Sequence, residues 1–153
     1  MSSKCDKPYT SNDKWVASVI SGLLFLLLAS PFTYTITNSV TSSFGLAIAD
    51  SEGCPNIAGI LVHAIVFTVL LRLLMNKDKE GCPKTTSDKD KWIISAMGGL
   101  LFVLISSPFL YNVVNSLTSS LGFEIADSDG CPNTGGVVLH SAVFVLITRL
   151  FMR

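Results

Sequence analysis

The sequence predicts an all-α integral membrane protein with four transmembrane helices, built as two tandem helical hairpins. Two observations lead to this fold class. The chain is 49% hydrophobic and only 14% charged, with a mean hydropathy of +0.54. It also contains a duplication, since the segment from Asp13 aligns without a gap with the segment from Asp90. A unit of about 77 residues is too long for a common solenoid repeat, so each unit should be a supersecondary element of its own.

Each unit holds two apolar runs, and all four are close to or above the ~18–20 residues that a membrane-spanning helix needs. A buried helix of a soluble protein should show a polar stripe, which LLFLLLASPF lacks. The runs cover residues 15–36, 57–75, 92–114 and 134–152. The predicted division is therefore an N-terminal tail at 1–14, a first hairpin at 15–76, a linker at 77–91 and a second hairpin at 92–153.

Charge predicts the orientation of these helices. The 11 Lys and Arg residues lie in the N-terminal tail with Lys14, in segment 72–91, and at the C-terminal end. The loops at 37–56 and 115–133 contain acidic residues and no basic ones. The positive-inside rule then places both termini and the linker on the cytoplasmic side. The two units should be parallel repeats related by an axis along the membrane normal. The formal net charge of zero gives no indication of a nucleic-acid partner.

A proline lies inside the first apolar run of each unit. Pro31 and Pro108 should kink these helices or end a first segment. Ile36, Val40 and Phe44 have helical spacing, which suggests that the first helix continues beyond the bilayer to a C-cap at Gly45. The motif DSEGCPN at residues 50–56, repeated as DSDGCPN at 127–133, then supplies turn formers and an asparagine N-cap for the returning helix.

The cysteines occupy matching positions in the two units. Cys54 and Cys131 fall in the loops opposite the cytoplasmic side, where an oxidising compartment would permit a disulfide between them. Free, partly buried thiols are the alternative, because a disulfide needs the two Cα atoms within ~7 Å. A second pair, Cys5 with Cys82, is less favoured in a reducing cytoplasm. The acidic loops lack the distal glutamate of a calcium loop, which favours a solvated turn.

Two histidines fall at membrane depth. His63 lies seven residues into its run, ~10 Å below the outer boundary, and the first run brings Ser30 to a similar depth. We therefore expect His63 to meet the Ser30–Pro31 region, and His140 to meet Ser107 and Pro108. The serine, or a carbonyl freed by the proline, could accept the imidazole N–H. The functional interpretation is a proton or ion path; the favoured one is a neutral histidine that holds two helices together.

Other residues predict packing and anchoring. Ser18 with Gly22, and Ser95 with Gly99, form small-xxx-small motifs that allow helices to approach closely. Trp15 and Trp92 are typical interface anchors. Arg72 and Arg149 lie near the inner ends of their helices, where we expect them to extend toward the headgroups. The chain shows no ion-selectivity filter, phosphate loop, metal-spaced cluster or catalytic triad, so we expect no catalytic, cofactor or metal site.

The pattern DKW(I/V), GLLF, SPF, NS(V/L)TSS, ADS(D/E)GCPN resembles small duplicated membrane proteins of large double-stranded DNA viruses of algae and protists. The resemblance covers nearly the whole chain from Asp13. It implies a protein of the virion's internal membrane, beneath an icosahedral capsid, and it implies no catalytic residues.

The favoured prediction is therefore a non-enzymatic structural membrane protein that packs with itself or links the membrane to a capsid or scaffold protein. One alternative is a small oligomeric channel or transporter with a path near His63 and His140. A further alternative is an assembly factor whose thiols matter.

Overall fold

The computed structural model of the chain describes residues 10–75 and 86–152. This part is all-helical and contains no sheet. Its elements are α1 (Ser11–Ala29), α2 (Pro31–Thr41), the 3₁₀ helix η1 (Ser42–Phe44), α3 (Ile57–Leu74), α4 (Asp88–Ile105), α5 (Pro108–Ser119) and α6 (Thr134–Phe151).

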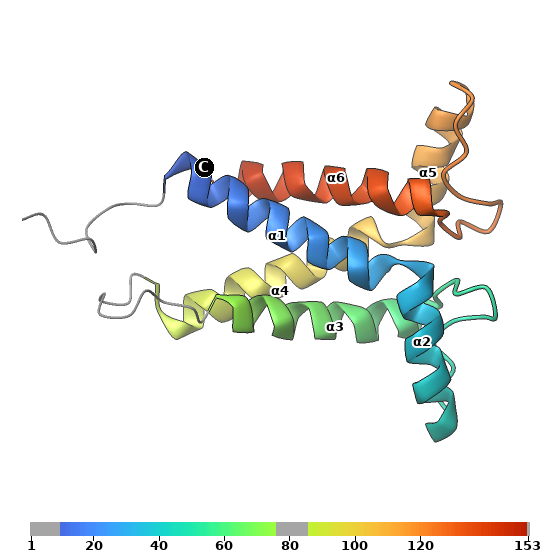
Figure 1. Cartoon of the computed structure of the whole chain (residues 1–153), viewed down its shortest axis with the longest axis horizontal. Coiled ribbons are helices and arrows are strands. Elements are labelled where there is room, and N and C mark those ends of the chain that lie inside the picture. Colours follow the sequence, from blue (N-terminus) through green and yellow to red (C-terminus); the bar gives the residue numbers. More distant parts are fainter. Residues whose placement is uncertain (1–9, 76–85, 153) are drawn as a thin grey trace, which may run out of the picture.

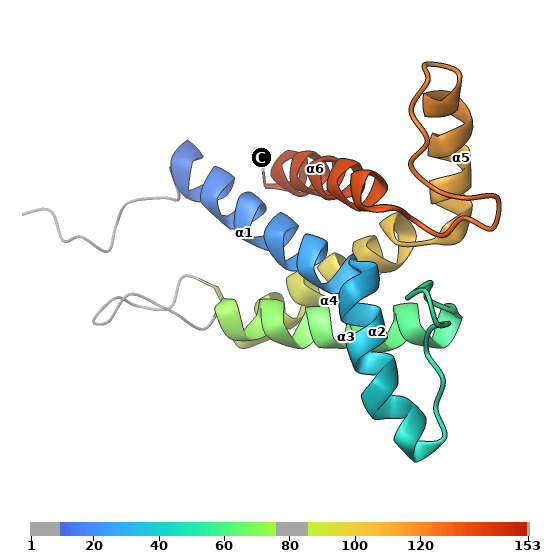
Figure 2. The same cartoon turned by 45° about the vertical axis from the view of Figure 1, so that its right-hand side comes forward.

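The long helices α1, α3, α4 and α6 form a bundle, and the short helices α2 and α5 leave it at one end in opposite directions (Figure 1). Helices α1 and α4 begin, and α3 and α6 end, at the other end of the bundle (Figures 1 and 2). Within the described residues α1, α3 and α6 are each long and apolar enough to cross a membrane, and α4 qualifies together with α5. These helices indicate a membrane protein.

The bundle is not assembled from two closed hairpins, which corrects the expected packing. The most extensive contacts join α3 to α4 and α1 to α6, whereas α1 and α3 contact each other much less. Each long helix thus packs mainly on a helix from the other half of the chain. Sequence periodicity gives the apolar face of a helix but not the partner of that face, so this arrangement was not predictable from the pattern.

A ring of four phenylalanines fills the centre of the bundle. Phe25 contacts Phe102 and Phe144, with ring centroids 5.2 and 4.9 Å apart. Phe67 contacts the same two side chains at 5.2 and 5.5 Å. One ring comes from each long helix, and none is more than 1% exposed. The ring therefore ties both helix pairs to one core.

The predicted helix at 15–36 is in fact two helices, because the chain breaks at Ser30. Ser30 adopts an extended conformation (φ −72°, ψ 140°) and its hydroxyl accepts a hydrogen bond from the Thr33 amide. A proline disfavours the helical conformation in the residue before it. Proline itself is well suited to the first position of a helix. Ser107 and Pro108 repeat the break, and there α4 and α5 are bent by 54°. The prolines therefore end one helix and begin another.

The loop after each short helix folds back along that helix. Gly45 has a left-handed conformation (φ 81°) that ends η1, as the sequence predicts. The Asn38 side-chain oxygen accepts hydrogen bonds from the amides of Ile48 and Ala49. Asn56 then caps α3 by accepting from the Gly59 amide at 2.9 Å. Asn115 and Asn133 make the same contacts in the second half.

Candidate functional site

The two acidic loops meet at one end of the bundle and are joined covalently. Cys54 and Cys131 form a disulfide, with Cα atoms 5.4 Å apart. The acidic residues of the motif build the turns that present these cysteines. The Asp50 carboxylate accepts hydrogen bonds from the amides of Glu52 and Cys54, both at 2.9 Å. Asp127 does the same for Asp129 and Cys131. Asp50 and Asp127 therefore stabilise the turns of their own loops.

An open cavity of about 310 Å³ lies beside the disulfide, and its lining includes Glu52, Glu124 and Asp127. It is a shallow acidic depression between the two loops. Across residues 10–75 and 86–152, no three His, Cys, Asp or Glu side chains are grouped so that they could hold a metal ion. The disulfide fixes the two loops that form this acidic face relative to each other.

Each predicted intramembrane histidine is bonded to the broken end of a helix. His63 Nδ1 lies 2.7 Å from the carbonyl oxygen of Leu28, and His140 Nδ1 lies 2.8 Å from that of Ile105. Both histidines are 2% exposed. The last carbonyls of a helix have no partner within it, and the break before Pro31 frees the Leu28 carbonyl. The histidine supplies the missing donor. Ser30 and Ser107 act as N-caps and not as histidine partners.

Two tyrosines that were not among the predicted site residues complete the histidine sites. Tyr34 of α2 stacks on His63 with ring centroids 4.0 Å apart, and Tyr111 of α5 stacks on His140 at 3.8 Å. Both tyrosines are 1% exposed. The sequence held a signal for these tyrosines, because Tyr34 in PFTY and Tyr111 in PFLY occupy matching positions of the two repeats. Each Tyr–His stack holds the start of a short helix on the bundle.

The small residues lie where long helices touch. Ser18 and Ser95 are fully buried. A Cβ atom at Gly22 would overlap Val145 of α6, and one at Gly99 would overlap Thr68 of α3. The small-xxx-small motifs thus line the α1–α6 and α3–α4 contacts.

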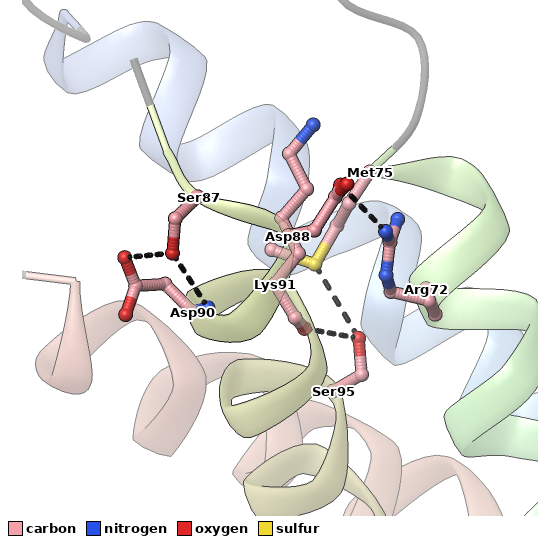
Figure 3. Close-up of polar contacts among 7 residues, drawn as sticks. All are labelled: Arg72, Met75, Ser87, Asp88, Asp90, Lys91 and Ser95. Atoms are coloured by element: carbon pink, nitrogen blue, oxygen red, sulfur yellow. Dashed lines mark hydrogen bonds and ion pairs between the residues drawn. The ribbon is translucent and has the colours of Figure 1, made fainter. Parts of the chain in front are cut away.

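The end of the bundle opposite the disulfide carries the predicted anchors. Arg72 is only 8% exposed. It forms a 3.0 Å ion pair with Asp88 (Figure 3) and lies 5.5 Å from the centre of the Trp92 ring. Arg149 donates to the Ser11 hydroxyl at 3.1 Å and lies 5.3 Å from the Trp15 ring. Both arginines therefore pack against neighbouring helices, and their extension toward the headgroups stays a prediction. Cation–π contact with tryptophan favours this arrangement.

Figure 3 also shows how the start of α4 is held at this end. The Ser87 side chain accepts from the Asp90 amide at 3.1 Å and donates to the Asp90 carboxylate. The Ser95 hydroxyl donates to the Lys91 carbonyl, and it lies 3.5 Å from the Met75 sulfur. The contact between Ser95 and Met75 ties α4 to the end of α3, whereas the other contacts hold the first turns of α4 together.

The second cysteine pair of the sequence analysis, Cys5 and Cys82, lies outside the described residues. Comparisons of the chain with protein-family models, curated proteins and solved structures found no match. Its function has to be inferred from its own residues.

Proposed function

We propose that the protein is a non-enzymatic structural component of a membrane, with both termini on the cytoplasmic side and the disulfide-linked loops on the opposite side. The phenylalanine ring is the observation that carries this proposal. Apolar rings in contact across the bundle axis support a solid, static bundle more than a conducting one. This group of four phenylalanines lies about one helical turn from the histidines, since Phe67 follows His63 by four residues.

The joined loops support a role in assembly. A disulfide between two loops fixes their relative position and limits the conformations of the unfolded chain. The resulting acidic face is rigid, and a rigid surface loses less entropy when it binds a partner. The proposed partners are further copies of the chain and a capsid or scaffold protein with basic residues. We propose a virion's internal membrane as the location, and the resemblance of the sequence to viral membrane proteins supports this choice.

A second candidate function, proton or ion conduction, is favoured by a separate observation. The Tyr34 and Tyr111 hydroxyls and His140 Nε2 are buried without a hydrogen-bond partner among the described residues. Polar groups buried in a membrane protein are functional candidates by default. A path through them would also have to pass the phenylalanine ring.

The test combines flux with crosslinking. The protein in liposomes should pass ions and protons no faster than protein-free liposomes, and the His63→Ala, His140→Ala double variant should not change this. On the native membrane, acid-to-lysine crosslinking with mass spectrometry should join Glu52, Glu124 or Asp129 to an abundant second protein or to other copies.

Two outcomes would overturn the structural proposal. Flux that is abolished by the double histidine variant would favour conduction. Trace abundance, with crosslinks only inside single chains, would remove the proposed assembly role.

A further inference from the structure

Both short helices carry an apolar stripe that nothing in the described chain covers. Phe32, Ile36, Val40 and Phe44 recur every four residues along α2 and η1, and each is between 51% and 85% exposed. Along and just beyond α5 the corresponding residues are 42% to 76% exposed; they are Phe109, Val113, Leu117 and Leu121. Residues four apart lie on one side of a helix. A continuous exposed apolar stripe of this kind marks a contact surface.

The acidic loop lies on the opposite side of each short helix. Asn38 is the residue of α2 that holds the loop, through the amides of Ile48 and Ala49. Ile36 and Val40 are each two positions from Asn38, which places them about 200° around the helix from it. Asn115 has the same relation to Val113 and Leu117 in α5. Each short helix therefore separates the acidic residues of its loop from its own apolar stripe.

Both short helices run across the direction of the long helices at one end of the bundle (Figures 1 and 2). In Figure 1 the loops lie to the right of α2 and α5, and the long helices extend to the left. Phe32, the first residue of the α2 stripe, shares a groove with Leu27 of α1 and Val138 of α6, so the stripe begins on the side of the long helices. If those helices cross a bilayer, α2 and α5 lie along its surface with the apolar stripe inward.

The apolar stripe is continuous with the exposed surface of the bundle. A groove of about 490 Å³ runs between α1, α2 and α6, and its lining includes Leu27, Phe32 and Val138. Leu27 and Val138 are themselves 60% and 52% exposed on the long helices. The hydrocarbon that covers the long helices would therefore reach the base of the α2 stripe. Neither α2 nor α5 contains a charged residue, so their contact surface suits acyl chains and does not depend on anionic headgroups.

We propose that α2 and α5 are in-plane helices, inserted at the boundary between headgroups and acyl chains of the leaflet on the disulfide side. Amphipathic helices of this kind bury an apolar face ~5–10 Å into that boundary. The inference requires the bundle to cross a membrane, and it is independent of the structural role proposed above. It assigns the stripes to lipid and leaves the acidic loops facing water.

The proposal can be tested with tryptophan as a depth probe in the full-length protein. Trp15→Phe and Trp92→Phe remove the native tryptophans. Val40→Trp on the stripe is then compared with Ser39→Trp, its exposed polar neighbour. Leu117→Trp and Ser116→Trp give the same comparison on α5. The probes are the quenching of emission by phosphatidylcholine brominated on its acyl chains and by iodide in the water. Retention of the Cys54–Cys131 disulfide on a non-reducing gel reports that each variant is folded.

We expect position 40 and position 117 to lose most of their emission to brominated lipid and little to iodide. Positions 39 and 116 should show the reverse. The same pattern should appear in vesicles with and without anionic lipid.

Strong iodide quenching at positions 40 and 117, with none from brominated lipid, would overturn the proposal by placing the stripes in water. Protection from both quenchers would also overturn it, since a second copy of the chain would then cover the stripe.

Discussion

The two main helix contacts of the bundle have the same shape and different chemistry. In the α1–α6 contact, Gly22 touches Val145, and the Ser141 hydroxyl donates to the Gly22 carbonyl at 2.8 Å. In the α3–α4 contact, Gly99 touches Thr68, and Ala64 occupies the place of Ser141. At the end of the bundle that carries the arginines, the α3–α4 contact has the additional interaction, because Arg72 forms an ion pair with Asp88. In the α1–α6 contact, Arg149 donates, among the described residues, only to the hydroxyl of Ser11.

Features that both contacts share are the ones that their common shape requires. Glycine is present at both contacts, so close approach of the helices is common to both. The interhelical hydrogen bond and the ion pair each occur in one contact among the described residues, so neither is needed to form the geometry. We therefore expect the glycines to matter most and the ion pair least.

The largest effect should come from filling the glycine positions. Gly22→Leu and Gly99→Leu each place a side chain where Val145 or Thr68 already lies. Such overpacking costs about 1–3 kcal/mol, which should lower the Tm of the detergent-solubilised protein by roughly 2–12 °C. Thermal unfolding followed by circular dichroism measures this. Ala17→Leu and Ala96→Leu, at exposed positions of α1 and α4, are the controls and should leave Tm nearly unchanged. A large loss for only one glycine would show that the two contacts are not equivalent.

A smaller effect should follow from the interhelical hydrogen bond. Ser141→Ala removes the donor to the Gly22 carbonyl. Hydrogen bonds between membrane helices average about 0.6 kcal/mol and reach about 1.7 kcal/mol, so Tm should fall by roughly 1–7 °C. Ala64→Ser offers the same hydroxyl to the α3–α4 contact and should not lower Tm. If both substitutions destabilise equally, the serine acts by its size and not by its hydrogen bond.

The smallest effect should come from the ion pair. The Asp88 side chain is 65% exposed, and exposed pairs contribute about 0.2–1 kcal/mol. Asp88→Ser should lower Tm slightly and Ser11→Asp should raise it slightly, which exchanges the chemistry of the two arginine sites. Both changes should fade at high salt because mobile ions screen exposed charges. Unfolding measured at low and high salt tests this, and shifts that persist at high salt would point to packing in place of charge.

Local features of the structure could be predicted from the sequence because local chemistry determines them. Asn56 caps α3, Gly45 ends η1 and Pro31 marks a helix boundary, each through contacts within a few residues. The meeting of His63 with the end of α1 also followed from counting residues along straight helices. These predictions need only the rise of a helix and the conformations that asparagine, glycine and proline favour.

What could not be predicted depends on contacts between distant segments. No pattern in α1 identifies α6 as its partner, because a face of small residues fits many surfaces. The break at Ser30 was one of two predicted outcomes for the proline, but the direction of α2 depends on the Tyr34–His63 stack. The position of Arg72 likewise depends on Trp92 and Asp88, which lie on another helix.

The in-plane helices have a mechanical consequence for the bilayer. Helices of 11 and 12 residues, at ~1.5 Å per residue and ~10 Å wide, cover roughly 300–400 Å² together. That area is added to one leaflet, and the described chain adds none to the other. A bilayer with unequal leaflet areas bends toward the smaller one, so each copy would act as a wedge. Membranes rich in this protein should curve with the disulfide-linked loops on the convex face.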